Sequence, residues 1–212
     1  MTSNWRDLAA SVRWRGIVAF AGNWIAPLEP SHGMHPSQLD SILETKGMHL
    51  PTAVREWYLL SANRPQDGLI VWILPKNFAA GDGVLWLLTD PDGINDWGIR
   101  IADLANDDPP VVTGKGNPHI ACSAFTQFVA TTIACNAIFD CGVDGPVELR
   151  PDAIHDASML HIASCFGDVF VDGSLESATI VMFAYPANEG VFARSRTTWG
   201  RERLEKLQHK PV

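Results

Sequence analysis

Asp96-Trp97-Gly98-Ile99, followed after a short loop by Asp107-Asp108-Pro109-Pro110-Val111, is the stretch that decides the fold of this chain. Residues 97–101 alternate in the manner of a half-buried strand, and two apolar runs, residues 69–74 and 84–88, precede them. The paired prolines are expected to end the sheet, because proline cannot donate a hydrogen bond to a central ladder. The sequence therefore predicts an antiparallel meander with at least one buried face.

Two helices are expected just upstream of the meander. The first covers about residues 37–46, and Gly47 follows it where a left-handed C-cap belongs. Leu50-Pro51-Thr52 starts the second, since proline fits a first turn whose N–H has no intrahelical partner.

The N-terminal segment predicts one further helix. Ser3 can cap it, Val12 lies on its apolar face and Gly16 ends it. Residues 17–20 are then expected as a short strand or a packed loop, and residues 27–36, rich in Pro, Gly and His, as a connection.

The downstream half predicts a mixture of helices and strands. Ser123 can cap a long helix to about Phe139. The other expected elements are a short helix capped by Asp152, strands over residues 169–171, 178–185 and 191–195, a hairpin loop over 186–190, and a last helix over 198–208. Without a repeat or linker, we predict a single domain over residues 1–212. Its expected fold is α+β, an antiparallel or mixed sheet with helices packed mainly on one side.

The chain is acidic, with a formal net charge of −8. Such a surface repels phosphate backbones, which argues against direct nucleic-acid binding, and attracts a basic partner. The alternative is that the charge serves solubility alone. Because the start of the chain has no secretory pattern and the apolar patch at residues 16–28 is broken by Gly and Pro, we expect no membrane span and a cytoplasmic protein.

The four cysteines match no Cys-x-x-Cys pair and no zinc pattern: Cys122, Cys135, Cys141 and Cys165. An even number of cysteines also permits disulfides. In a long chain without a secretory signal we expect free buried thiols in a reducing compartment.

Three motifs, in this order, resemble the SUKH superfamily. The first is Leu50-Pro51 at the start of a helix, and the second is the strand that carries Trp97-Gly98-Ile99. The third is the acidic Asp107-Asp108-Pro109-Pro110-Val111, which precedes a long helix. The resemblance covers about residues 37–139, and residues 1–36 lie outside it as an N-terminal extension.

One departure from the family pattern lies in the turn before Trp97. Family members often carry Glu-Asn-Gln-Gly there, whereas this chain has Asp90-Pro91-Asp92-Gly93. The acid and the glycine are kept in kind, but any role of the amide pair does not carry over.

The resemblance implies an α+β fold without enzymatic activity. Bacterial relatives are implied to be immunity proteins that neutralise polymorphic or contact-dependent toxins, often nucleases, and fungal relatives to be regulators that act by protein contact. We therefore expect a non-enzymatic binding module without a cofactor, whose partner is a basic toxin domain. A regulatory scaffold of the same fold and a small carboxylate-dependent hydrolase or transferase are the alternatives.

The candidate partner-binding residues are acids of the central region that could face a basic surface and speed the encounter with it: Asp90, Asp92, Asp96, Asp107 and Asp108. The alternative explanation is that aspartate simply favours turns and solvated loops. Catalysis by these acids would require a concave pocket that holds several of them with raised pKa values.

The other candidate residues favour structural roles. Trp97 is expected in the core rather than as a recognition anchor. Without a serine elbow, a phosphate loop or a calcium-loop pattern, we assign no catalytic residue and no metal ligand. Solvated or capping positions are expected for the histidines His32, His35, His119, His155 and His161.

Overall fold

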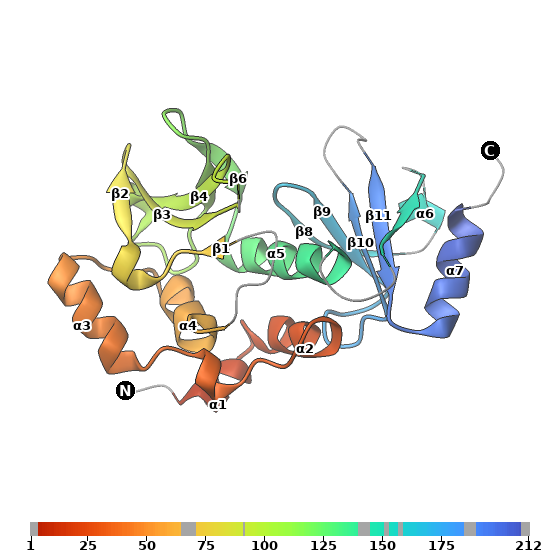
Figure 1. The fold of residues 1–212 in the computed structure, drawn as a ribbon, viewed down its shortest axis with the longest axis horizontal. Helices are drawn as coiled ribbons and strands as arrows, with labels where there is room; N and C mark the ends of the chain where they lie inside the picture. Colours follow the sequence, from red (N-terminus) through yellow and green to blue (C-terminus); the bar gives the residue numbers. More distant parts are fainter. Residues whose placement is uncertain are drawn as a thin grey trace. The chain divides into compact units, whose positions relative to one another are not determined.

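The structure is a computed structural model that describes residues 4–64, 71–90, 92–139, 145–150, 153–156, 159–184 and 190–208. Its internal contacts divide the chain into two compact units, each with an antiparallel sheet (Figure 1). Unit one comprises Met1–Arg15 and Leu28–Thr126, and unit two comprises Gly16–Pro27 and Gln127–Val212. The α+β class is thereby confirmed. The prediction of a single domain over residues 1–212 stays a prediction.

The two helices expected before the meander are confirmed in unit one. Helix α3 spans Pro36–Lys46 and ends at Gly47, whose φ of 60° and ψ of 33° form the left-handed C-cap. Helix α4 spans Thr52–Ser61 with Pro51 at its N-cap, and the 3-10 turn η1 (Pro30–His32) lies in the predicted connection. Both α3 and α4 lie on the same side of the sheet of unit one (Figure 1).

The first helix is shorter than predicted. Helix α1 covers Trp5–Ala9, and the side chain of Asn4 caps it, whereas the predicted cap, Ser3, lies outside the described residues. The prediction that Val12 belongs to its buried face is wrong, because the helix has already ended and Val12 is 87% exposed.

The sheet of unit one has the strand order β1–β3–β4–β5–β6, with β2 paired to β3. Its elements are β1 (Val71–Trp72), η2 (Pro75–Asn77), β2 (Ala79–Gly81), β3 (Val84–Thr89), β4 (Asp96–Arg100), η3 (Ile101–Asp103), β5 (Val111–Thr113) and β6 (His119–Cys122). The predicted meander is confirmed. The prediction that the two prolines end the sheet is wrong, because they occupy a connection after which β5 pairs with β4.

The Trp97-Gly98-Ile99 stretch is explained by packing. Trp97 is 7% exposed, which confirms its predicted place in the core. A Cβ atom at Gly98 would overlap the carbonyl oxygen of Leu85 on the neighbouring strand β3. Glycine is therefore required here by the close approach of two backbones.

Unit two begins with a helix that the sequence prediction missed. Helix α2 spans Arg15–Trp24, so a strand or packed loop over residues 17–20 is wrong, and Gly16 lies inside this helix instead of ending α1. Ile17, Phe20 and Trp24 are buried at a spacing of three and four residues, which is one face of a helix.

The long helix α5 spans Phe125–Phe139, which confirms the prediction. Its buried residues include Phe128, Val129 and Ile133, and they occur around most of its circumference. A helix that is apolar on nearly all sides must be covered on all of them.

The sheet of unit two has the strand order β7–β11–β10–β9–β8. Its elements are β7 (Val147–Leu149), α6 (Ala153–Asp156), β8 (Leu160–Ser164), β9 (Asp168–Val171), β10 (Ile180–Ala184), β11 (Val191–Ser195) and α7 (Thr198–Gln208). The antiparallel pairing of β10 with β11 confirms the predicted hairpin, and α7 matches the predicted last helix. The predicted loop residues 186–189 and the predicted cap Asp152 lie outside the described residues.

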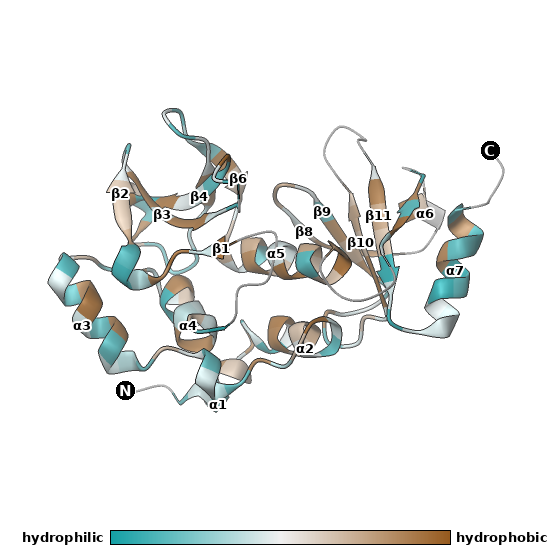
Figure 2. Cartoon of the chain, viewed as in Figure 1, coloured by the Kyte–Doolittle hydropathy of each residue, from teal (hydrophilic) through white to brown (hydrophobic). Residues whose placement is uncertain are grey.

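Helices cover both faces of this second sheet, where one covered face was expected. On one face, Met182 of β10 belongs to a buried cluster with Leu204 of α7. On the other, the ring of Phe183 lies 6.4 Å from that of Phe139 in α5. Successive strand residues point to opposite faces, so β10 is buried on both sides. The hydropathy colouring agrees: the strands are largely brown, and α7 alternates brown and teal (Figure 2).

The cysteines correct one prediction in part. Cys122 and Cys165 are disulfide-bonded, so the expectation of free thiols is wrong for these two. Cys135 keeps a buried thiol, as expected, and Cys141 lies outside the described residues. Disulfide formation depends on distance in space, which sequence spacing does not reveal.

Candidate partner-binding site

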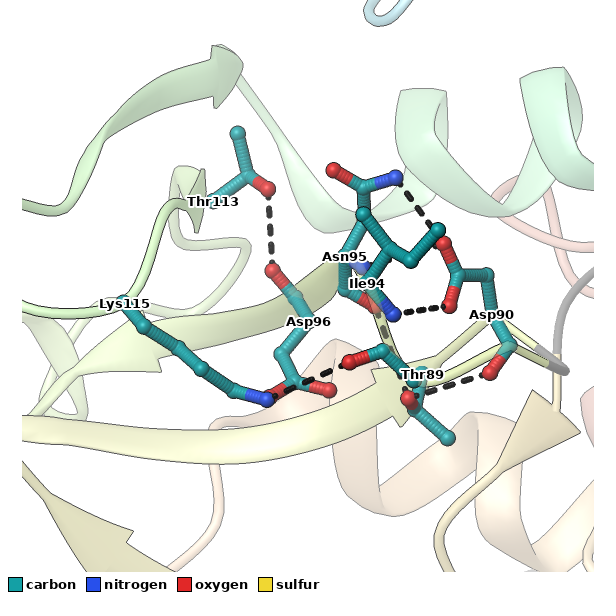
Figure 3. Close-up of polar contacts among 8 residues, drawn as sticks. Thr89, Asp90, Ile94, Asn95, Asp96, Thr113 and Lys115 are labelled. Atoms are coloured by element: carbon teal, nitrogen blue, oxygen red, sulfur yellow. Dashed lines mark hydrogen bonds and ion pairs between the residues drawn. The ribbon is translucent and has the colours of Figure 1, made fainter.

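Asp90 shapes the turn between β3 and β4 (Figure 3). Its carboxylate accepts hydrogen bonds from the backbone N–H of Ile94 at 2.7 Å and from the backbone and side-chain N–H groups of Asn95, both at 2.9 Å. The backbone N–H of Asp90 also donates to the carbonyl of Asn95 at 3.0 Å. These bonds join Asp90, the first residue of the turn, to Ile94 and Asn95 at its other end.

Lys115, from the connection between β5 and β6, contacts the same turn (Figure 3). Its Nζ lies 2.8 Å from the Asp96 carboxylate and 3.4 Å from the carbonyl oxygen of Gly93. The Thr113 hydroxyl donates to the backbone carbonyl of Asp96 at 2.9 Å. Because the Asp96 side chain is only 14% exposed and already paired, it offers little free charge to a partner.

Two side chains of the turn face solvent. Ile94 is 74% exposed, and Asp92 is exposed beside it. No hydrogen bond or ion pair joins the Asp92 carboxylate to another residue in the described part of the chain. The turn therefore presents one apolar and one acidic side chain to solvent, next to residues that Asp90 holds by hydrogen bonds.

Asp107 lies at the start of α4, where it joins segments that are distant in sequence. Its backbone carbonyl accepts a hydrogen bond from Ala53 N–H at 3.0 Å. Its carboxylate accepts a hydrogen bond from the Thr52 hydroxyl and pairs with Arg13, which also bonds Glu56 at 2.8 Å. The helix-start motif and the acidic motif that carry the family resemblance therefore contact each other.

Asp108 caps the start of α5. Its carboxylate accepts hydrogen bonds from the backbone N–H of Thr126 at 3.0 Å and from the Thr126 hydroxyl at 2.6 Å. An N–H in the first turn has no intrahelical partner, and the helix dipole places partial positive charge there. Asp108 therefore has a structural role that accounts for its acid group.

The local electrostatics lower the pKa of two of these acids. The hydrogen bond from the Thr52 hydroxyl, followed by the charge of Arg13, lowers the pKa of Asp107 despite some desolvation. Desolvation raises the pKa of Asp90, but the hydrogen bonds from Asn95 and the turn backbone together lower it further than that. A lowered carboxyl pKa is the opposite of what a general acid requires at neutral pH.

The predicted site residues thus fall into two sets. The structure brings Asp90, Asp92 and Asp96 together in one turn, and it uses Asp107 and Asp108 at the starts of two helices. Of these two sets, the turn is the one in which the described residues pair an exposed acid, Asp92, with an exposed apolar side chain, Ile94. A partner-binding role for the five acids stays a prediction.

Sequence reasoning missed a polar cluster on the β8–β9 hairpin of unit two. The Ser164 hydroxyl donates to Asp168 at 2.5 Å and lies 2.9 Å from His161 Nε2, which is 3.4 Å from the same carboxylate. In a catalytic triad the serine bonds one ring nitrogen and the acid bonds the other, whereas here both contacts use Nε2. The cluster is exposed and lacks triad geometry. The hairpin register pairs Ser164 with Asp168, but β8 itself was not predicted, so sequence offered no signal for the cluster.

Metal ligation and membrane insertion find no support in the described ranges. No group of three or more His, Cys, Asp or Glu side chains among them is placed to hold a metal ion. No helix among them combines the length and the apolar character needed to cross a bilayer.

Comparisons of this chain with models of protein families, with curated proteins and with solved structures find no match.

Proposed function

We propose that this chain is a non-enzymatic protein-binding module of SUKH type, an immunity protein that neutralises a basic toxin domain such as a nuclease. The observation that carries the proposal is the β3–β4 turn, where Ile94 and Asp92 are exposed and the Asp90 carboxylate accepts a hydrogen bond from the Ile94 N–H. The family resemblance implies that the partner is a toxin domain, and the net charge of −8 implies that the surface of this partner is basic.

The turn suits a contact surface because the hydrogen bonds of Asp90 restrain Ile94 and Asn95, so these residues lose less conformational freedom on binding. Ile94, now mostly in water, can enter an apolar recess of a partner. Burying one isoleucine side chain contributes about 2 kcal/mol, which is roughly a 30-fold change in Kd.

We expect Asp92 to affect the rate of association with the partner more than the final affinity. An exposed charge at the rim of an interface mainly changes the association rate and its dependence on salt. The other acids support the same surface indirectly, because Asp90 and Asp96 use their carboxylates to hold the turn.

Two alternatives make different predictions. A regulatory scaffold of the same fold would bind several partners through this turn instead of one tight partner. A carboxylate-dependent hydrolase or transferase would hold several of these acids in a concave site with raised pKa values. The pKa of Asp90 is lowered, Asp96 is paired with Lys115, and Asp108 is bonded to Thr126, which favours the binding module.

The proposal places the chain in the cytoplasm, without a cofactor, a nucleic-acid partner or a membrane partner. The disulfide-bonded state of Cys122 and Cys165 counts against a reducing compartment. Alkylation of thiols in freshly lysed cells decides this point. Labelled Cys122 and Cys165 agree with the cytoplasm, and complete protection of both contradicts it.

The test is to identify a toxin domain encoded beside this gene, to co-express the two, and to measure the Kd of the purified pair. Ile94→Ala is expected to weaken binding about 30-fold. Asp92→Asn is expected to slow association and to reduce its salt dependence. Ile120→Ala is the matched control, because Ile120 is another isoleucine of unit one with high exposure, 56%.

Two outcomes contradict the proposal. If the chain neither binds the neighbouring toxin nor protects cells from it, the immunity function is wrong. If it binds and protects, but Ile94→Ala behaves like Ile120→Ala, the turn is not the contact surface.

A further inference from the structure

The hairpin between β2 and β3 turns through two residues, Asp82 and Gly83. Gly81 and Val84 pair with each other on either side of them. Asp82 has a φ of 54° and Gly83 a φ of 73°, and positive φ at both central residues is the mark of a type I′ turn. An L residue adopts this left-handed region at a cost in conformational energy, although aspartate tolerates it better than most. Asp82 therefore holds an unfavourable backbone conformation directly before a glycine.

Two groups that can react with each other are open at this turn. Asp82 is exposed, and its carboxylate has no hydrogen bond or ion pair to any residue that the structure describes. The backbone N–H of Gly83 likewise makes no hydrogen bond within the described ranges. A Cβ atom at Gly83 would meet no other atom within 4 Å, so the space around this glycine is open.

Ring closure between an aspartate side chain and the next nitrogen requires one particular backbone angle. The five-membered ring is nearly planar, so the nitrogen must eclipse Cβ. For an L residue this sets ψ at about −120°, which with a φ of about 60° is the first central position of a type II′ turn. Types I′ and II′ are the two turns that two-residue hairpins favour. Asp82 already has the required φ, and glycine accepts either sign of φ, so rotation of the peptide between Asp82 and Gly83 reaches the reactive conformation.

We propose that Asp82 and Gly83 form a succinimide, and then isoaspartate, in the folded protein. The Gly83 nitrogen attacks Cγ of the protonated Asp82 side chain, the N–Cγ bond forms, and the hydroxyl leaves with the amide proton as water. Water then opens the ring at one of its two carbonyls. Opening at Cγ restores aspartate, whereas opening at the main-chain carbonyl leaves Gly83 joined through Cγ and adds one carbon atom to the backbone. This inference does not rest on the proposed function, because the β2–β3 turn is not part of the proposed contact surface.

Other aspartate–glycine pairs are held against this reaction. The chain has five such pairs, and three lie wholly within the described residues: 82–83, 92–93 and 172–173. The N–H of Gly93 donates to the Asp90 carbonyl at 3.0 Å, so its nitrogen is engaged. The Asp172 carboxylate accepts hydrogen bonds from the N–H groups of Thr179 at 2.7 Å and Ile180 at 2.8 Å, and from the Thr179 hydroxyl. Ring closure at either pair must first break these bonds.

The added backbone atom acts on one strand at the edge of the sheet. Among the described strands, β2 pairs with β3 alone, through three residue pairs, and all three residues of β2 are exposed. Turn type and loop length fix the register of a hairpin, and a lengthened loop no longer matches this one. We therefore expect isoaspartate at position 82 to release β2 from β3 and to leave the pairing of β3 with β4 intact.

The test is peptide mapping of the native full chain after storage in water labelled with heavy oxygen. Opening of the succinimide places one labelled oxygen at the reacting aspartate, and electron-transfer fragmentation distinguishes isoaspartate from aspartate. A parallel sample unfolded in urea sets the storage time, which ends when all three pairs carry label. In the native sample Asp82 is expected to react at least about tenfold faster than Asp92 or Asp172, because those two pairs must first lose hydrogen bonds.

Two variants separate the chemistry from the fold. Asp82→Gly keeps positive φ accessible but removes the carboxyl group, so label at this turn is expected to disappear. Asp82→Asn keeps the turn, since asparagine–glycine is a preferred type I′ pair, and forms the same succinimide by loss of ammonia. Its label is expected sooner than in the wild type, because an amide carbon is a better electrophile than an ionised carboxylate.

Hydrogen exchange measures the structural consequence. Amide exchange over residues 79–81 is expected to speed up in the isoaspartate form, separated from the unmodified protein by ion exchange, while exchange over residues 96–100 stays unchanged. The proposal is overturned if native Asp82 takes up no label while the urea sample does, or if native Asp92 or Asp172 is labelled as fast as Asp82. Unchanged exchange over residues 79–81 in the isoaspartate form would overturn the predicted release of β2.

Discussion

Replacing Leu204 by alanine tests whether the two units unfold together as the single predicted domain. Leu204 is 1% exposed and belongs to the buried cluster of unit two that also contains Ile180 and Met182. Truncating a leucine in such a place lowers the free energy of unfolding by about 3 kcal/mol. With a urea m value of about 2 kcal/mol/M, the unfolding midpoint falls by about 1.5 M.

Two optical probes separate the units. Tryptophan fluorescence reports mainly on unit one, because only Trp24 and Trp199 of the eight tryptophans belong to unit two. Far-UV circular dichroism reports on both units. A single cooperative domain requires the same fall in midpoint by both probes, although the mutated residue lies in unit two.

The result that refutes this reasoning is a fluorescence midpoint that stays at the wild-type value while the dichroism midpoint falls. The units would then unfold separately, and the prediction of one domain would be wrong. Leu160→Ala is the matched control, the same truncation in unit two at a leucine that is 54% exposed. It is expected to change stability by no more than about 0.5 kcal/mol.

Three further substitutions test the structure of unit one. Tyr58→Phe is expected to lower the free energy of unfolding by about 1–2 kcal/mol, because the buried hydroxyl donates to the Ile73 carbonyl at 2.9 Å; an unchanged urea midpoint would contradict that bond. Desolvation raises the pKa of Tyr58. The contribution of the protonated hydroxyl to stability is therefore complete below about pH 10 and is lost as the pH rises through the raised pKa. An ultraviolet titration of the wild type, with Tyr58→Phe as reference, measures this pKa. The hydrogen bond from Thr52 and the charge of Arg13 lower the pKa of Asp107, so the wild type keeps this stabilisation above about pH 4 and loses it as the pH falls through the lowered value. Asp107→Asn should flatten this acid dependence of the urea midpoint, and identical pH profiles for the two proteins would count against the ion pair. Gly98→Ala is expected to reduce soluble yield and melting temperature sharply because of the overlap with Leu85, whereas Gly81→Ala, whose Cβ comes no closer than 3.7 Å to Trp86, should melt like the wild type.

Elements with a regular apolar spacing and clear ends were predictable from sequence. Helix α3 has its left-handed glycine, α4 has its proline start, and α7 has Leu204 and Leu207 on a charged background. In each of these, local capping and long-range burial favour the same structure, so local reasoning is sufficient.

Elements whose outcome depends on distant residues were not predictable. Helix α2 has apolar residues at helical spacing, but Gly22 and Asn23 within it are residue types that commonly end a strand or form a loop. The prolines before Val111 disfavour a strand locally, yet β5 directly after them pairs with β4. Both depend on packing partners that are not visible in a local window.

The candidate site was predictable only in part. The clustering of acids in the central region pointed to the β3–β4 turn. That Asp90 bonds the turn backbone, that Lys115 neutralises Asp96, and that Ile94 remains exposed depend on the fold. Counting charges treats all acids as equal, whereas Asp92 is the exposed acid of the turn that has no hydrogen bond or ion pair among the described residues.

For the proposed contact surface, the arrangement of side chains in this turn has a consequence for how binding specificity can change during evolution. The residues that fix its backbone, Asp90 and Asn95, are distinct from Asp92 and Ile94, which face solvent. Replacing either exposed side chain removes none of the side-chain bonds that hold the turn. In the proposed immunity protein, point mutations at these two positions can therefore change the contact surface without removing those bonds, which would allow the protein to follow changes in the surface of its toxin.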